Sequence, residues 1–158
     1  MAYTDYAFYK NEYHGDVVPE TDFPKYADRA SDRVDEITFD RLADGLSSDS
    51  RANKKVQKAV CSVAEALYQI DSVKNALLNN LGTVETEDGK VTGKTVSSVT
   101  AGSESITYST GTSDASKTVY AQAAMDKKVE NILIRQSAGQ YLYGVKDDKG
   151  EYLLYAGI

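Results

Sequence analysis

The stretch VQKAVCSVAEALYQI, residues 56–70, decides the fold class of this chain. Its apolar residues recur every three or four positions, which is the spacing of one face of an α-helix. The pattern continues beyond this stretch, and its apolar positions are Val56, Val60, Val63, Leu67, Ile70, Leu77 and Leu81. With Ser48 or Asp49 as N-cap and Gly82 after the last turn, the pattern predicts a helix of roughly 30 residues, about 45 Å long. That length implies an elongated subunit or a kink near Asp71–Ser72.

Helical spacing is also present on both sides of this long helix. Asp22 is a suitable N-cap for an earlier helix, with Pro24 in its first turn, and Gly45 follows its last residue. The first two helices therefore occupy 22–81. A third helix is predicted over 113–138, closed by Gly139. We expect a mainly α fold, a small helical bundle in a single domain, 1–158.

Two segments have a strand-like pattern instead. Within the segment 83–110, the stretch VSSVTAGSESITYST at 96–110 carries one charged residue and places β-branched residues around a turn at Ala101–Gly102. This pattern predicts a β-hairpin insertion after a polar loop. The tail, 139–158, predicts a short β-like element with a turn at DDKG. An isolated hairpin is marginal in water, and its edges are free to pair with another chain.

The first 21 residues are predicted to be a loop-like aromatic arm, in which tyrosine and phenylalanine residues are followed by GDVVPE at 15–20. This segment is too short to be a domain. It is either an arm packed on the helical body or a segment that docks on a partner.

Composition and charge exclude several classes of function. The chain has 158 residues and a net charge of −6, and its densest basic cluster is Lys54, Lys55 and Lys58. Sequence-specific binding of nucleic acid is therefore not expected. No segment approaches the ~20 apolar residues of a membrane span, and the first residues lack a signal-peptide pattern. We expect cytosol-like surroundings, no membrane partner, and a buried thiol at Cys61.

A search for catalytic, cofactor-binding and metal-ligating residues identifies none. The best phosphate-loop candidate, Gly89–Thr95, has Asp88 where a phosphate loop needs glycine, so a flexible loop explains its glycines better. His14 is the single histidine and has no companion nucleophile. The carboxylates of the first helix alternate with Lys25, Arg29 and Arg33, which is the pattern of a solvated, ion-paired face. We therefore predict no cofactor and no enzyme activity.

Several short motifs, in order along nearly the whole chain, resemble head–tail connector (adaptor) proteins of tailed bacteriophages and prophages of Gram-positive bacteria. The arm resembles Y-x-F-Y-x-x-x-Y-x-G, followed by a V-P-E-x-x-F segment and an A-S-x-x-V-D-x-I-T helix core. A middle S-x-x-x-G-x-x-S-x-x-Y segment and an L-L-Y-x-G ending also match. The matching residues are Tyr6, Phe8, Tyr9, Tyr13, Gly15, Pro19, Glu20, Phe23, Ala30, Ser31, Val34, Asp35, Ile37, Thr38, Ser98, Gly102, Ser105, Tyr108, Leu153, Leu154, Tyr155 and Gly157.

The resemblance implies a structural protein of the virion neck, assembled in the cytoplasm of a bacterial host. Such adaptors form a homo-oligomeric ring, usually of twelve copies, beneath the portal protein. They extend the DNA channel without specific DNA binding and dock the stopper or tail-completion proteins. The fold implied is a small helical bundle with a β insertion.

Within this interpretation the sequence predicts three sets of contact residues. The hairpin would contact a neighbouring subunit through Val96, Val99, Gly102, Ile106 and Tyr108. The tail would dock on the portal through Tyr152, Leu153, Leu154, Tyr155 and Ile158. The arm would make its contacts through Tyr6, Phe8, Tyr9 and Tyr13. Two alternatives stay open: another tail-completion or structural component of a phage-like particle, and a nucleotide-binding protein that uses the loop at 89–95.

Overall fold

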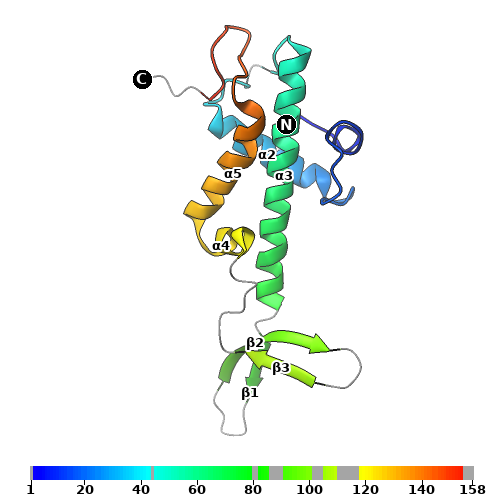
Figure 1. Cartoon of the computed structure of the whole chain (residues 1–158), viewed down its shortest axis with the longest axis vertical. Helices are drawn as coiled ribbons and strands as arrows, with labels where there is room; N and C mark the ends of the chain where they lie inside the picture. Colours follow the sequence, from blue (N-terminus) through cyan, green and yellow to red (C-terminus); the bar gives the residue numbers. More distant parts are fainter. Residues whose placement is uncertain are drawn as a thin grey trace. The chain divides into compact units, whose positions relative to one another are not determined.

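The computed structural model describes residues 2–43, 45–79, 82–85, 91–100, 105–109 and 118–154 (Figure 1). Its elements in chain order are α1 (Tyr6–Phe8), η1 (Tyr9–Tyr13), α2 (Phe23–Ile37), α3 (Ser50–Asn79), β1 (Gly82–Glu85), β2 (Val91–Thr100), β3 (Ser105–Ser109), α4 (Val119–Met125) and α5 (Lys127–Leu142). The described residues are mainly helical, so the predicted mainly α class is confirmed. The chain divides into two compact units, 1–69 with 131–158 and 70–130.

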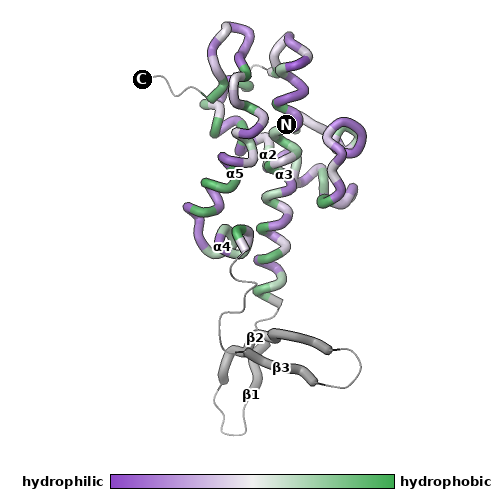
Figure 2. The backbone as a smooth tube through the Cα atoms, in the orientation of Figure 1, coloured by the Kyte–Doolittle hydropathy of each residue, from purple (hydrophilic) through white to green (hydrophobic). Residues whose placement is uncertain are grey.

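The predicted long helix is present as α3, and it is continuous from Ser50 to Asn79. Its apolar stripe supplies much of the core of the first unit, where Val56, Val60 and Val63 are at most 2% exposed. Figure 2 shows hydrophobic residues recurring along α3 between hydrophilic ones, as one-sided burial requires. The periodicity of the sequence therefore corresponds to the buried side of this helix.

The helix α2 is shorter than the predicted helix over 22–44, because it ends at Ile37. The Thr38 hydroxyl donates to the Val34 carbonyl oxygen at 2.9 Å, which satisfies a carbonyl of the last turn. Phe39 and Asp40 then adopt left-handed backbone conformations, both with φ 57°. Residues Phe39–Ala43 follow as turns, so these residues of the predicted helix are not helical.

The arm, which the sequence describes as loop-like, contains two helical segments, α1 and η1. The Asp5 side chain accepts a hydrogen bond from the Phe8 amide at 2.8 Å and caps α1. The segment closes at Gly15, whose amide donates to the Tyr9 carbonyl oxygen at 2.9 Å. A Cβ atom at Gly15 would lie 2.0 Å from the Tyr9 ring, so only glycine fits there.

The predicted third helix, 113–138, differs from the structure at an interruption in its described part and at its C-terminal end. Asp126, with φ −124° and ψ 117°, separates α4 from α5. The helix α5 then continues past Gly139 to Leu142. Glycine costs about 1 kcal/mol in a helix interior, whereas burying a leucine gains about 1.5–3 kcal/mol. Because Leu142 is fully buried, the helix extends.

The predicted β-like tail at 139–158 is therefore wrong for its first residues, which are helical. Beyond α5, the described tail contains one isolated β-bridge, between Lys146 and Tyr152, and no strand. Gly150 adopts the left-handed conformation expected of its turn, with φ 84°.

In the second unit, β1, β2 and β3 pair in that order as antiparallel strands. The register places Val96 opposite Tyr108 and Val99 opposite Ile106. Residues 101–104, which hold the predicted turn, lie outside the described residues. The hairpin at 96–110 therefore stays a prediction.

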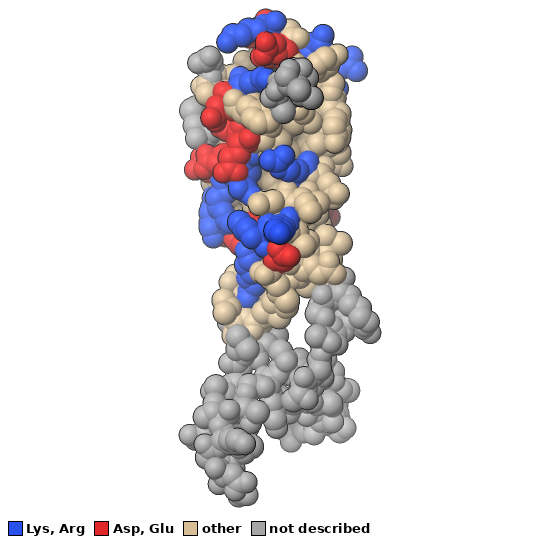
Figure 3. Space-filling view, turned by 90° about the vertical axis from the view of Figure 1, so that its left-hand side faces the viewer, with Lys and Arg blue, Asp and Glu red and all other residues tan. Residues whose placement is uncertain are grey.

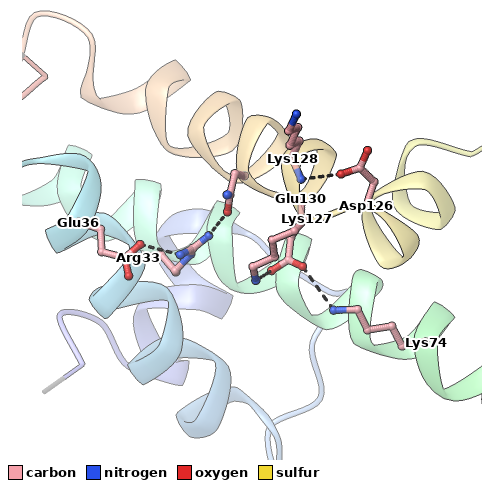
Figure 4. Close-up of polar contacts among 8 residues, drawn as sticks. Arg33, Glu36, Lys74, Asp126, Lys127, Lys128 and Glu130 are labelled. Atoms are coloured by element: carbon pink, nitrogen blue, oxygen red, sulfur yellow. Dashed lines mark hydrogen bonds and ion pairs between the residues drawn. The ribbon is translucent and has the colours of Figure 1, made fainter.

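The helical part of the second unit is joined by a buried carboxylate. Glu130, 6% exposed, accepts hydrogen bonds from Lys127 Nζ at 2.7 Å and Lys74 Nζ at 3.4 Å (Figure 4). Burial alone would raise the pKa of Glu130, but Lys127 and Lys74 outweigh it and hold the pKa below its usual value. This ion-paired carboxylate is structural.

Candidate functional site

The aromatic arm packs on its own body around the Tyr9 hydroxyl. Tyr9 is fully buried. Its hydroxyl donates to Glu65 Oε1 at 2.8 Å and accepts from the amides of Val17 at 2.9 Å and Val18 at 3.0 Å. Tyr13 donates to the other Glu65 oxygen at 3.2 Å. Of the two alternatives for the arm, these contacts favour the packed one.

Aromatic rings extend this packing to the other predicted arm residues. The rings of Tyr9 and Tyr6 lie 4.6 and 5.7 Å from the Phe23 ring, and Phe8 is partly buried against the same core. Burial raises the pKa of Tyr9 and Tyr13, and the Glu65 charge adds to the effect. Both phenols therefore stay protonated donors near neutral pH.

Tyr3 engages the polar residues of α2 that the sequence singles out. Its amide donates to Ser31 Oγ at 3.0 Å, and its hydroxyl donates to Asp35 Oδ1 at 2.7 Å. Burial raises the pKa of Asp35, although the Tyr3 hydrogen bond opposes the rise. Ser31 and Asp35 thus hold the N-terminal segment.

The C-terminal turn is held at two points, which we call the tail clasp. At the first point, Asp148 accepts hydrogen bonds from Ser47 Oγ at 2.6 Å, the Ser48 amide at 3.0 Å and Ser48 Oγ at 3.0 Å. These bonds, with Ser47 the largest contributor, lower the pKa of Asp148. At the second point, Arg41 donates to the carbonyl oxygens of Tyr152 at 2.7 Å and Leu153 at 3.3 Å.

Beside the clasp lies a hollow of about 300 Å³, which we call the tail hollow. Its apolar lining comes from all three segments that meet there, the turn after α2, the start of α3 and the tail. Those apolar residues are Leu42, Leu46, Ala52, Val56, Val145 and Leu153. The rest of the lining is mostly charged, so the hollow offers polar groups to a partner as well as apolar ones.

Two half-exposed aromatic rings flank the tail hollow. Phe39 is 52% exposed and Tyr152 is 51% exposed. Arg41 links them, because its guanidinium lies 5.8 Å from the Phe39 ring centre and bonds the Tyr152 carbonyl. Lys146 Nζ lies 4.7 Å above the Tyr152 ring. Aromatic and arginine side chains in this arrangement are typical of protein–protein contact sites.

The backbone that presents Phe39 is strained. Phe39 and Asp40 are successive non-glycine residues with φ 57°. Such conformations cost about 1–3 kcal/mol each, and they concentrate at functional sites. The strain holds a large apolar ring on the surface rather than in the core.

The residues predicted to dock on the portal have different surroundings. Tyr152 is exposed beside the tail hollow, whereas Leu153 is 1% exposed and lines the hollow from the protein's own core. Leu154 is partly buried against that core. Tyr155 and Ile158 lie outside the described residues.

The predicted subunit-interface residues belong to the second unit. Val96 and Val99 lie in β2, Ile106 and Tyr108 lie in β3, and Gly102 lies outside the described residues. The alternative nucleotide site requires a loop followed by a helix. Gly93 and Lys94 lie instead in β2, paired with Thr83 and Gly82 of β1.

Sequence reasoning missed Phe39, Arg41 and Asp148. A signal for Phe39 was present, since it lies off the apolar stripe of α2 and is therefore out of phase with a helix over 22–44. No sequence signal identifies Tyr152 as the partner of Arg41, because the two residues lie 111 positions apart.

The described residues contain no cluster of three His, Cys, Asp or Glu side chains that is suited to a metal ion. Cys61 is fully buried, and burial raises the pKa of its thiol to about 12. On the face drawn in Figure 3, basic side chains lie next to acidic ones. No described helix is both long and apolar enough to cross a membrane.

Comparisons with protein-family models, with curated proteins and with solved structures gave no match for this chain.

Proposed function

We propose that this chain is a structural head–tail adaptor subunit that assembles as a ring below a portal protein in the neck of a phage-like particle. In this role it extends the DNA channel and docks the stopper or tail-completion proteins. The proposal starts from the adaptor-like motifs of the sequence. The observation that supports it best is the tail hollow, a depression lined by both apolar and charged residues, which lies beside two half-exposed aromatic rings and the tail clasp.

The contacts of the motif residues are consistent with a structural protein. Tyr9, Gly15 and Phe23 pack the arm against α2 and α3, while Ser31 and Asp35 bind Tyr3. Side chains engaged in this way define a fold rather than a reaction centre. A chain with this role needs docking surfaces, and the tail hollow is one.

The net charge of −6 suits a subunit past which DNA must move. Like charge lowers the retention of a polyanion on a surface. We therefore expect weak binding of duplex DNA to the isolated protein, with little dependence on base sequence. Tight, salt-dependent DNA binding would count against the proposal.

Electron microscopy of the purified protein mixed with the portal protein from the same source tests the proposal. Decoration of one end of the portal ring is the expected result. The tail hollow is tested in the same assay with Phe39→Ala and Tyr152→Ala, each of which should weaken portal binding by about 2 kcal/mol, roughly 30-fold.

Tyr143→Ala is the matched control, because Tyr143 is 74% exposed and its ring lies beside Gly139 of α5, whereas Lys146, which lines the tail hollow, lies over the Tyr152 ring. Portal rings that stay undecorated by the wild-type protein would contradict the adaptor proposal. Equal weakening by Tyr143→Ala would leave the tail hollow without a specific role.

A further inference from the structure

The turn after α2, residues 38–43, has a conformation that its own residues do not favour. Thr38 is the C-cap of α2, and Phe39 follows in the left-handed conformation, at a position where many helices have glycine. The Asp40 amide closes the turn by donating to the Asp35 carbonyl oxygen at 2.9 Å. In turns of this type the side chains at these two positions often make an apolar contact, which two aspartates cannot supply.

Charge within the turn adds to the backbone strain. Burial raises the pKa of Asp35, and the charge of Asp40 raises it further. Phe39 and Asp40 are both left-handed, which is unfavourable for residues with a Cβ atom. The conformation of the turn therefore depends on contacts from other parts of the chain.

Three contacts reach the turn from elsewhere. Arg41 donates to the Tyr152 carbonyl oxygen of the tail at 2.7 Å, and Leu42, 3% exposed, packs in the core. The third contact is the Tyr3 hydroxyl, which donates to Asp35 Oδ1 at 2.7 Å and to the Leu42 carbonyl oxygen at 3.2 Å. One hydroxyl group therefore bonds both the last turn of α2 and the segment that follows it.

Tyr3 is itself held by α2 and α3, independently of the turn. Its amide donates to Ser31 Oγ of α2 at 3.0 Å, and its carbonyl oxygen accepts from Gln57 Nε2 of α3 at 3.3 Å. The backbone of the N-terminal segment is thus fixed to both helices, and its tyrosine side chain restrains the turn.

The same turn forms one wall of the tail hollow, because Phe39, Asp40, Arg41 and Leu42 are consecutive residues of its lining. We propose that Tyr3 holds this wall in place, so that the N-terminal segment controls how often the tail hollow is formed. When the Tyr3 contacts break, the strained turn opens locally while α2 and α3 stay folded on their own core.

A partner that docks in the hollow binds the closed form of the turn. Because coupling between two sites is reciprocal, such a partner also stabilises the N-terminal segment in its bound position. The inference rests on the proposed function only for the existence of that partner, since the coupling between Tyr3 and the turn is a property of the chain alone.

Hydrogen exchange of single amides, measured by NMR on the full chain, tests the coupling. The amides that close the turn are those of Asp40, Ala43 and Gly45. In the wild type they should exchange faster than the Val60 amide in the middle of α3, which reports global unfolding. Tyr3→Phe keeps the ring and removes the hydroxyl, and it should speed exchange of the turn amides by about five- to thirtyfold, the effect of losing one or two hydrogen bonds.

Two controls separate this local effect from a general loss of stability. The Gly15 amide, bonded to the Tyr9 carbonyl oxygen at the other end of the arm, should keep its wild-type rate in Tyr3→Phe. Tyr13→Phe makes the same change at a hydroxyl that bonds Glu65, and it should leave the turn amides unchanged.

Relief of the strain should compensate for the lost hydroxyl. Glycine adopts the left-handed conformation without a steric cost, so Phe39→Gly combined with Tyr3→Phe should return the turn amides toward the wild-type rate. The inference fails if the wild-type turn exchanges only as fast as Val60, if Tyr3→Phe leaves the turn amides unchanged or speeds Gly15 equally, or if Phe39→Gly does not compensate. Exchange requires no portal, so undecorated portals with a Tyr3-dependent turn contradict the adaptor proposal alone.

Discussion

Replacing Tyr9 by phenylalanine removes a single oxygen atom from the most connected polar point of the arm. That oxygen donates to Glu65 and accepts from the amides of Val17 and Val18, with distances between 2.8 and 3.0 Å. The ring itself, fully buried against Phe23, keeps its place in the variant. The substitution therefore tests the hydrogen bonds separately from the packing.

The expected loss follows from the partners left behind. An unsatisfied buried donor costs about 1–3 kcal/mol, and the Val18 amide, in a residue 2% exposed, falls in this class. The Val17 amide and the Glu65 carboxylate are partly exposed and recover hydrogen bonds from water. Together these terms predict a loss of about 2–4 kcal/mol in the free energy of unfolding, a large fraction of the stability of an ordinary domain.

Urea unfolding, followed by circular dichroism, measures this loss as a shift of the midpoint at constant slope. Tyr13→Phe is the control, because it removes one hydrogen bond of 3.2 Å to the same carboxylate and should cost at most about 1 kcal/mol. A loss in Tyr9→Phe no larger than in Tyr13→Phe would refute the assignment of Tyr9 as the polar anchor of the arm.

Four further predictions concern glycine fit, helix charge, thiol reactivity and pH. Gly15→Ala should lower the free energy of unfolding by about 1–3 kcal/mol, because the new Cβ atom would lie 2.0 Å from the Tyr9 ring. Gly139→Ala should raise it by about 0.5–1 kcal/mol in the same urea assay, because its Cβ atom would lie 3.2 Å from the ring of Tyr143, which is exposed and can move. Arg51→Glu should raise the thermal midpoint, because it removes a cation from the first turn of α3 and adds an anion there, worth about 0.3–1 kcal/mol; a lowered midpoint would contradict the charge argument. Cys61 should react with a thiol reagent only as fast as the protein unfolds, since the thiol is buried and its pKa is raised to about 12; rapid labelling of the native protein would contradict its burial. The pKa of Tyr9 is higher in the folded protein than in the unfolded chain. Its contribution to stability is therefore complete below pH ~10 and is lost as the pH rises through the folded pKa. The free energy of unfolding should accordingly fall less steeply above pH ~10 in Tyr9→Phe than in the wild type.

Helices that bury one side against the core can be predicted from the sequence. The stripe through Val56 and Val63 predicted α3 because each of its positions meets the same core. Boundaries were harder, because they depend on competition between local and distant contacts. Gly139 by itself predicts the end of a helix, but the free energy gained by burying Leu142 exceeds the cost of a glycine inside the helix, so the helix continues.

The candidate site could be predicted only in part, and for a related reason. The adaptor resemblance predicts Tyr152 as a docking residue, but its backbone position depends on Arg41, which lies 111 positions away in the sequence. The tail hollow exists because the strained turn at Phe39, the start of α3 and the tail meet. The pattern of residues along the sequence does not show that these three distant segments contact one another.

The two ends of the described chain are held by α3 and by the segment just before it, and this has a consequence for partner binding. Glu65 of α3 holds the arm, and Ser47, Ser48 and Arg41, just before α3, hold the tail. Ordering a side chain at an interface costs about 0.5–1.5 kcal/mol. Since Arg41 holds the Tyr152 backbone and Lys146 lies over its ring, a partner that docks there binds a partly preorganised surface. Breaking the clasp by Asp148→Ala should therefore weaken partner binding, and Tyr152→Ala in that background should lose less than it does alone.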